Sequence, residues 1–145
     1  MNLENFEKRC DEIREENEKY LQIFKEDNRN ISPKTISSHV ENVSFYINEY
    51  LLRNEPLTME QGTSSIDGFL GDFFIRKCMW STPATIKSTA ASIKKFYKSM
   101  EKHGFVEKRD YDDLCLEIKK TMDQWLEECA RFNDPDEDED EFAGQ

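Results

Sequence analysis

The chain has 145 residues, a length that suits one domain with an extension, and 35% of the residues are charged. Ten Phe, five Tyr and two Trp are enough for a hydrophobic core, and only five Gly and four Pro interrupt helices. No run approaches the roughly 18 apolar residues of a membrane span, so no membrane partner is expected. The first residues have neither a basic head nor an apolar block. We therefore expect no export signal, a cytoplasmic protein and four reduced cysteines.

The net charge of −11 is unevenly distributed along the chain. Residues 134–141 contain seven acids and no base, and without them the net charge is −4. Residues 31–109 contain eleven Lys or Arg against eight Asp or Glu, a net charge of +3. The middle of the chain is therefore mildly basic. Because like charges cannot pack together, residues 134–145 are predicted to be a disordered acidic tail.

The first two predicted helices are separated by a polar break. Over residues 3–26, apolar residues recur at three- and four-residue spacing, interrupted by Asn17, which predicts an amphipathic helix within an N-terminal segment 1–30. Ser32 followed by Pro33 is typical of a helix start, because serine caps the end and proline fits the first helical position. A second helix is therefore expected over residues 33–53.

Three further helices are predicted after a loop at residues 57–63. A short helix is expected over residues 64–77, and a long one over 83–103, ending at Gly104. A last amphipathic helix, roughly 110–132, lies in a segment 109–133 that we expect to pack on the domain. The chain is therefore predicted to be all-α. Its second and fourth helices are expected to be the longest of the bundle and to pack against each other, because both have wide apolar faces.

Residues that could catalyse a reaction or hold a metal ion are few. His39 and His103 are the only histidines, and neither lies at metal-ligand spacing from a cysteine or another histidine. Glycine-rich phosphate loops and nucleophile motifs are absent. The acidic tail lacks the turn glycine and the final glutamate of a calcium loop. We therefore expect no enzyme activity, no cofactor and no metal site.

Basic and hydroxyl-bearing residues gather on two of the predicted helices. Four lysines of the fourth helix follow each other by seven, four and four residues, which places them in one row: Lys87, Lys94, Lys98 and Lys102. Other polar residues lie near the starts of the second and fourth helices: Lys34, Thr35, Ser38, Thr85 and Ser88. Free amides, hydroxyls and lysines at a helix start suit a phosphate oxygen. The alternative interpretation is a row of lysines that only water contacts.

Two segments of the chain resemble a known DNA-binding domain. Residues 32–51 (SPKTISSHVENVSFYINEYL) and 81–105 (STPATIKSTAASIKKFYKSMEKHGF) resemble the first and last long helices of the core-binding domain of tyrosine recombinases, the phage-integrase family. The short helix at 66–75 matches that domain's middle element in place and length. The resemblance covers residues 31–108. It implies a SAM-like orthogonal bundle of four helices, here with an additional amphipathic helix at one or both ends.

The resemblance also implies a function without catalysis. The family's catalytic domain, with its two arginines, His-x-x-Arg motif and tyrosine nucleophile, has no room in this chain. A DNA-binding module that contacts the backbone of duplex DNA is therefore expected. The resemblance carries this contact over to seven residues of the second and fourth helices: Lys34, Thr35, Ser38, Thr85, Lys87, Ser88 and Lys94. Lys98 and Lys102 join them as members of the lysine row. A full-length recombinase or another protein is a further possible partner. The alternative is a protein–protein interaction module of the same fold that has lost DNA affinity. The net charge and the acidic tail favour this alternative, or else autoinhibition of DNA binding.

Overall fold

The computed structural model describes residues 2–134, and every regular element in that range is helical. The elements are α1 (Leu3–Asp27), α2 (Pro33–Ser44), η1 (Phe45–Tyr50), η2 (Glu60–Ser64), α3 (Ile66–Gly68), η3 (Phe69–Phe73), α4 (Phe74–Lys77), α5 (Pro83–Lys102) and α6 (Lys108–Phe132). The predicted all-α class is confirmed, whereas the SAM-like arrangement stays a prediction. The predicted disordered tail lies outside the described residues except for Asp134.

The helix starts form as their sequences predict. The Ser32 hydroxyl accepts a hydrogen bond from the Thr35 amide at 3.2 Å, and Pro33 occupies the first turn of α2. Thr82 caps α5 in the same way, with Pro83 in its first turn. After α5, Gly104 has a φ of +80°, a left-handed conformation that glycine adopts without a steric penalty.

Two element boundaries and the ranking of helix lengths differ from the predicted ones. The second helix ends at Tyr50 and not at residue 53, because α2 continues as the π-helical turn η1 and then gives way to a turn. The predicted loop at 57–63 contains most of the short helix η2, whose start is held by bonds between Thr58 and Gln61. The helices predicted at 33–53 and 83–103 are the longest within residues 31–108. They are not the longest of the whole bundle, because α1 and α6 have 25 residues each.

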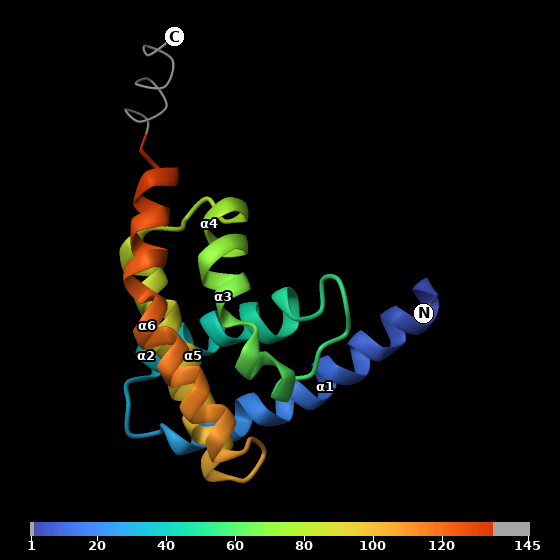
Figure 1. The fold of residues 1–145 in the computed structure, drawn as a ribbon. Coiled ribbons are helices and arrows are strands. Elements are labelled where there is room, and N and C mark those ends of the chain that lie inside the picture. The colour runs from blue at the N-terminus through green and yellow to red at the C-terminus, as the bar shows by residue number, and fades with distance from the viewer. Residues whose placement is uncertain (1, 135–145) are drawn as a thin grey trace.

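Helix α5 lies at the centre of the bundle, between α6 and α2 (Figure 1). Its packing against α2, which the sequence predicts, is confirmed by a hydrogen bond from the Asn42 side chain to the Ser92 hydroxyl at 2.9 Å. Phe96 of α5 meets Phe24 of α1 edge-on at 5.6 Å between ring centroids. The three long helices around α5 therefore share one core with it.

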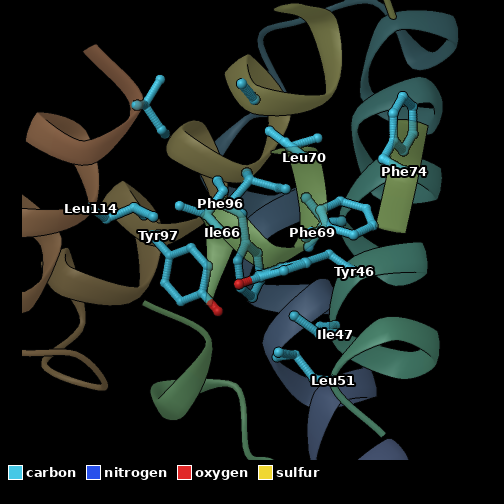
Figure 2. Close-up of a cluster of buried hydrophobic side chains, with 14 of the residues drawn as sticks. Tyr46, Ile47, Leu51, Ile66, Phe69, Leu70, Phe74, Phe96, Tyr97 and Leu114 are labelled. Carbon is cyan, nitrogen blue, oxygen red and sulfur yellow. The ribbon is translucent and has the colours of Figure 1, made fainter. Parts of the chain in front are cut away.

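Two buried tyrosines fasten η2 to this core. Figure 2 shows Tyr46 and Tyr97 approaching each other from η1 and α5. The Tyr97 hydroxyl donates to the Met59 carbonyl at 2.6 Å, and the Tyr46 hydroxyl donates to the Gly62 carbonyl. A Cβ at Gly62 would lie 2.3 Å from the Tyr97 hydroxyl and 2.8 Å from a methyl of Leu51. Glycine is therefore the only residue that fits there without displacing the core.

Helix α1 belongs to the bundle only over its C-terminal half. Leu21 and Phe24 lie in the main core, whereas Cys10 and Ile13 pack with Leu52 in a small separate cluster. The N-terminal turns of α1 extend away from the other helices (Figure 1), and Leu3 there is 71% exposed. The acidic first helix therefore offers a long surface to the outside of the domain.

Candidate nucleic-acid interface

The lysine row lies on a face of α5 that the described residues 2–134 leave uncovered. The opposite face is buried along its whole length, from Ile86 to Met100. Lys87, Lys94 and Lys98 are exposed, and none of them forms an ion pair within residues 2–134. At 1.5 Å per residue, the row from position 87 to 102 spans roughly 22 Å. An extended row of positive charge therefore faces solvent, and three of its four members have no ion pair within the described residues.

Lys102 differs from the other members of the row because it has an acidic neighbour. Its Nζ lies 3.7 Å from Oδ1 of Asp27, the last residue of α1. Asp27 also accepts a hydrogen bond from the Ser99 hydroxyl and contacts Nε2 of His103 at 2.9 Å. The bond from Ser99 is the main cause that holds the pKa of Asp27 below its usual value, and His103 and Lys102 act in the same direction against its desolvation. The charge of Lys102 is thus partly compensated.

The hydroxyls at the start of α5 serve the helix itself. The Thr85 hydroxyl accepts a hydrogen bond from the Thr82 amide at 2.8 Å, while the Thr82 hydroxyl accepts one from the Thr85 amide at 3.1 Å, which forms a capping box. Thr85 is only half exposed. The Ser88 hydroxyl is exposed and donates back to the Thr85 carbonyl at 3.2 Å. Of these predicted phosphate contacts, Ser88 therefore has the more accessible oxygen.

The predicted residues of α2 are all exposed. The Thr35 hydroxyl accepts a hydrogen bond from the Ser32 hydroxyl at 2.9 Å, and the Ser38 hydroxyl donates to the Lys34 carbonyl at 3.3 Å. Lys34 has no ion pair with a described residue. These side chains are free to meet a ligand from solvent.

The two helix starts do not lie side by side, because α2 and α5 run antiparallel. Phe45, at the end of α2, meets Trp80 before α5 at 5.8 Å between ring centroids. His39, nearer the start of α2, lies 2.8 Å from the Ser92 hydroxyl in the middle of α5. Burial of His39 and the neighbouring charge of Lys95 lower the pKa of that histidine. The start of α2 is therefore directed toward the C-terminal half of the lysine row, and the predicted set divides into two groups.

Two exposed residues before α5 were not among the predicted contacts. Met79 is fully exposed and Trp80 is 57% exposed, although the Trp80 ring also packs edge-on against Phe74. The only signal in the sequence was their position in the turn before the Thr82 cap. An exposed indole beside a basic helix suits stacking on a nucleic-acid base or sugar.

The chain matches no protein-family model, no curated protein and no solved structure. The resemblance to the recombinase core-binding domain therefore rests on the residues quoted above. Residues 2–134 contain no cluster of three or more metal-ligating side chains. No helix in that range has the length and apolar character needed to cross a bilayer.

Proposed function

We propose that this chain is a non-catalytic DNA-binding module of the recombinase core-binding type, with residues 31–108 forming a SAM-like bundle. The exposed face of α5 contacts the backbone of duplex DNA, and the start of α2 adds further contacts. The observation that carries the proposal is the row formed by Lys87, Lys94 and Lys98, because no acid within the described residues compensates these three charges. Lysines on a helix face neutralise phosphates and do not read base edges, so little sequence preference is expected.

The acidic tail regulates this contact in the proposal. The side-chain amide of Asn133 donates to the Ser81 carbonyl at 2.7 Å, which ties the end of α6 to the start of α5. The tail thus leaves the domain close to the Lys87 end of the row. Twelve residues can reach at most about 40 Å, which exceeds the roughly 22 Å of the row. Tethered carboxylates at high local concentration would therefore compete with phosphates for the same lysines.

The second candidate function is a protein–protein interaction module that has lost DNA affinity. Exposed Met79 and Trp80 favour it, because large apolar side chains are enriched in protein interfaces. Both functions are compatible with a full-length recombinase as partner, which the resemblance suggests.

A binding assay with a mixed-sequence 20-base-pair duplex at low salt separates the two functions. The intact chain and a chain ending at residue 133 are compared by fluorescence anisotropy. DNA binding by the shortened chain, and weaker binding by the intact one, supports the proposal. No binding by the shortened chain at low salt means that the lysine row is only a solvated face, and the interaction module then becomes the better explanation.

A further inference from the structure

Two adjoining cavities follow the outer side of α1 and have no part in the proposed DNA contact. The larger has a volume of about 540 Å³ and lies between Glu12 and Ile23, closed on one side by Phe105. The smaller, of about 190 Å³, lies between α1 and the segment that leads into η2. Glu16 and Tyr20 line both. Together the cavities form one groove, the α1 groove, which extends for roughly 21 Å along the helix, from Arg9 to Ile23.

The α1 groove has apolar walls and an acidic rim. Tyr20 and Phe105 pack against each other at 5.1 Å between ring centroids, and Ile23 continues this apolar surface. Four carboxylates border the two cavities: Glu12, Glu15, Glu16 and Glu60. Two cations do so as well, but Arg9 is paired with Glu12 at 3.2 Å, which leaves Lys19 as the counter-charge to the other three carboxylates. The rim therefore favours a cationic ligand.

A residue that lines the smaller cavity carries a buried hydrogen-bond acceptor without a donor among the described residues. Asn17 lines this cavity and is 1% exposed. Its side-chain nitrogen donates to the Ile47 carbonyl at 3.3 Å and to Oδ1 of Asn48 at 2.9 Å, which turns the nitrogen toward η1. Its carbonyl oxygen has no hydrogen-bond partner within the described residues. Buried polar atoms nearly always have a partner, so this oxygen is available to a donor from outside the described residues.

Glu16 is held in position to receive the same donor. The Tyr20 hydroxyl donates to Oε1 of Glu16 at 2.7 Å. Burial, followed by the bond to Glu16 and the nearby charge of Glu60, raises the pKa of Tyr20, so the phenol keeps its proton and the bond. The second oxygen of Glu16 is left for a ligand. The smaller cavity is thus lined by residues with hydrogen-bond acceptors: Asn17, Glu16 and Glu60. The hydroxyl of Tyr20 already donates its proton to Glu16.

We propose that the α1 groove binds an arginine-bearing amphipathic helix of a partner protein. The guanidinium enters the smaller cavity, where its five N–H donors can serve Asn17 Oδ1 and the carboxylates of Glu16 and Glu60 together. An apolar side chain one turn along the partner helix packs on Tyr20 and Phe105. A segment of protein fits better than a free small cation, because the acidic cavity and the apolar wall follow each other along one groove. Side chains from successive turns of a single bound helix would contact both. The inference goes beyond DNA binding and does not depend on it.

The test uses the intact chain and two acetylated 15-residue alanine-based helical peptides. One carries an arginine with leucines four residues to either side, and the other carries neutral citrulline in place of the arginine. Binding is followed by titration in two-dimensional NMR spectra. The arginine peptide is expected to bind saturably and at least tenfold more tightly than the citrulline peptide. The side-chain amide signals of Asn17 are expected to shift during the titration.

Matched variants locate the contact. The double variant Glu16→Gln/Glu60→Gln should weaken binding of the arginine peptide at least tenfold. The control Glu4→Gln/Glu26→Gln makes the same change of net charge at exposed positions of α1 outside the groove, and should change affinity less than twofold. Glutamate substitution of the α5 lysines should not weaken peptide binding, so failure here is distinguishable from failure of DNA binding.

Several results would overturn the inference. One is the absence of saturable binding by the arginine peptide up to millimolar concentration. Another is equal affinity for the arginine and citrulline peptides, a comparison that uses the native protein and needs no variant to fold. An equal loss of affinity in the Glu4→Gln/Glu26→Gln control would show only general attraction between opposite charges. Shifts confined to residues away from Asn17 would place the peptide elsewhere.

Discussion

Reversing the charge of Lys87, Lys94 and Lys98 should abolish binding to duplex DNA. The triple variant Lys87→Glu/Lys94→Glu/Lys98→Glu replaces three uncompensated positive charges on the exposed face of α5 with three negative ones. Non-specific affinity comes from phosphate neutralisation, so losing these contacts and adding repulsion should remove detectable binding at low salt. The assay is fluorescence anisotropy of the 20-base-pair duplex with the chain that ends at residue 133.

The salt dependence gives this prediction a magnitude. With three phosphates neutralised, log K should fall with log salt with a slope of about −2.7. Affinity should then drop roughly 40-fold between 50 and 200 mM salt. This count covers the row on α5 alone, without Lys34 at the start of α2, and Lys102 is left out of it because it lies 3.7 Å from Asp27. If it lost that partner and contacted DNA as well, the slope would approach about −3.6.

The fold should survive the substitutions. All three positions lie opposite the buried face of α5 and make no ion pair within the described residues. Surface changes of this kind usually alter the free energy of unfolding by about 0.5 kcal/mol or less each. Urea denaturation followed by circular dichroism checks this point.

A matched variant controls for net charge. Lys8→Glu/Lys119→Glu/Lys120→Glu makes the same change of charge at exposed positions of α1 and α6. It should retain most of the affinity. The reasoning is refuted if the α5 variant binds within twofold of the parent, if the control loses as much affinity as the α5 variant, or if native binding is independent of salt.

Three further predictions follow from the geometry. Deleting residues 134–145 should strengthen DNA binding at low salt and have little effect at high salt, measured in the same anisotropy assay. In the intact chain, strong protection of the amides of residues 134–145 against hydrogen exchange would contradict their predicted disorder. The pKa of Asp27 is lowered, mainly by the hydrogen bond from Ser99. The contribution of this carboxylate to the free energy of unfolding is therefore complete above the usual pKa of 3.8, and it is lost as the pH falls through the lower folded value. Denaturation curves of Asp27→Asn between pH 2 and 6 should therefore converge with those of the native chain at the acid end only. Gly62→Ala should lower the free energy of unfolding by about 1–3 kcal/mol, because its Cβ would lie 2.3 Å from the Tyr97 hydroxyl, and an unchanged urea midpoint would contradict this packing.

Local sequence signals were sufficient for the long helices of this fold, but not for the short helix η2, most of which lies in a predicted loop. Ser32 with Pro33, Thr82 with Pro83 and the glycine after α5 act within one helical turn, so they place helix ends whatever the rest of the chain does. The lysine row could be predicted for the same reason, because helical periodicity alone puts residues seven and four apart on one face. Its exposure also followed, since the apolar residues of α5 occupy the opposite face.

Only the tertiary structure decided how these pieces meet. The antiparallel packing of α2 on α5 separates the two helix starts, and contacts between residues 72 to 76 positions apart pair Asp27 with Ser99 and His103. Asn17 interrupts the apolar stripe of α1 in the sequence, but its missing hydrogen-bond partner and its cavity appear only when η1 and η2 pack beside it. Periodicity and capping depend on neighbours within four residues, whereas charge compensation and cavities depend on which distant surfaces come together. The sequence by itself therefore determined the helices and the basic face, and the packing determined which charges stay free.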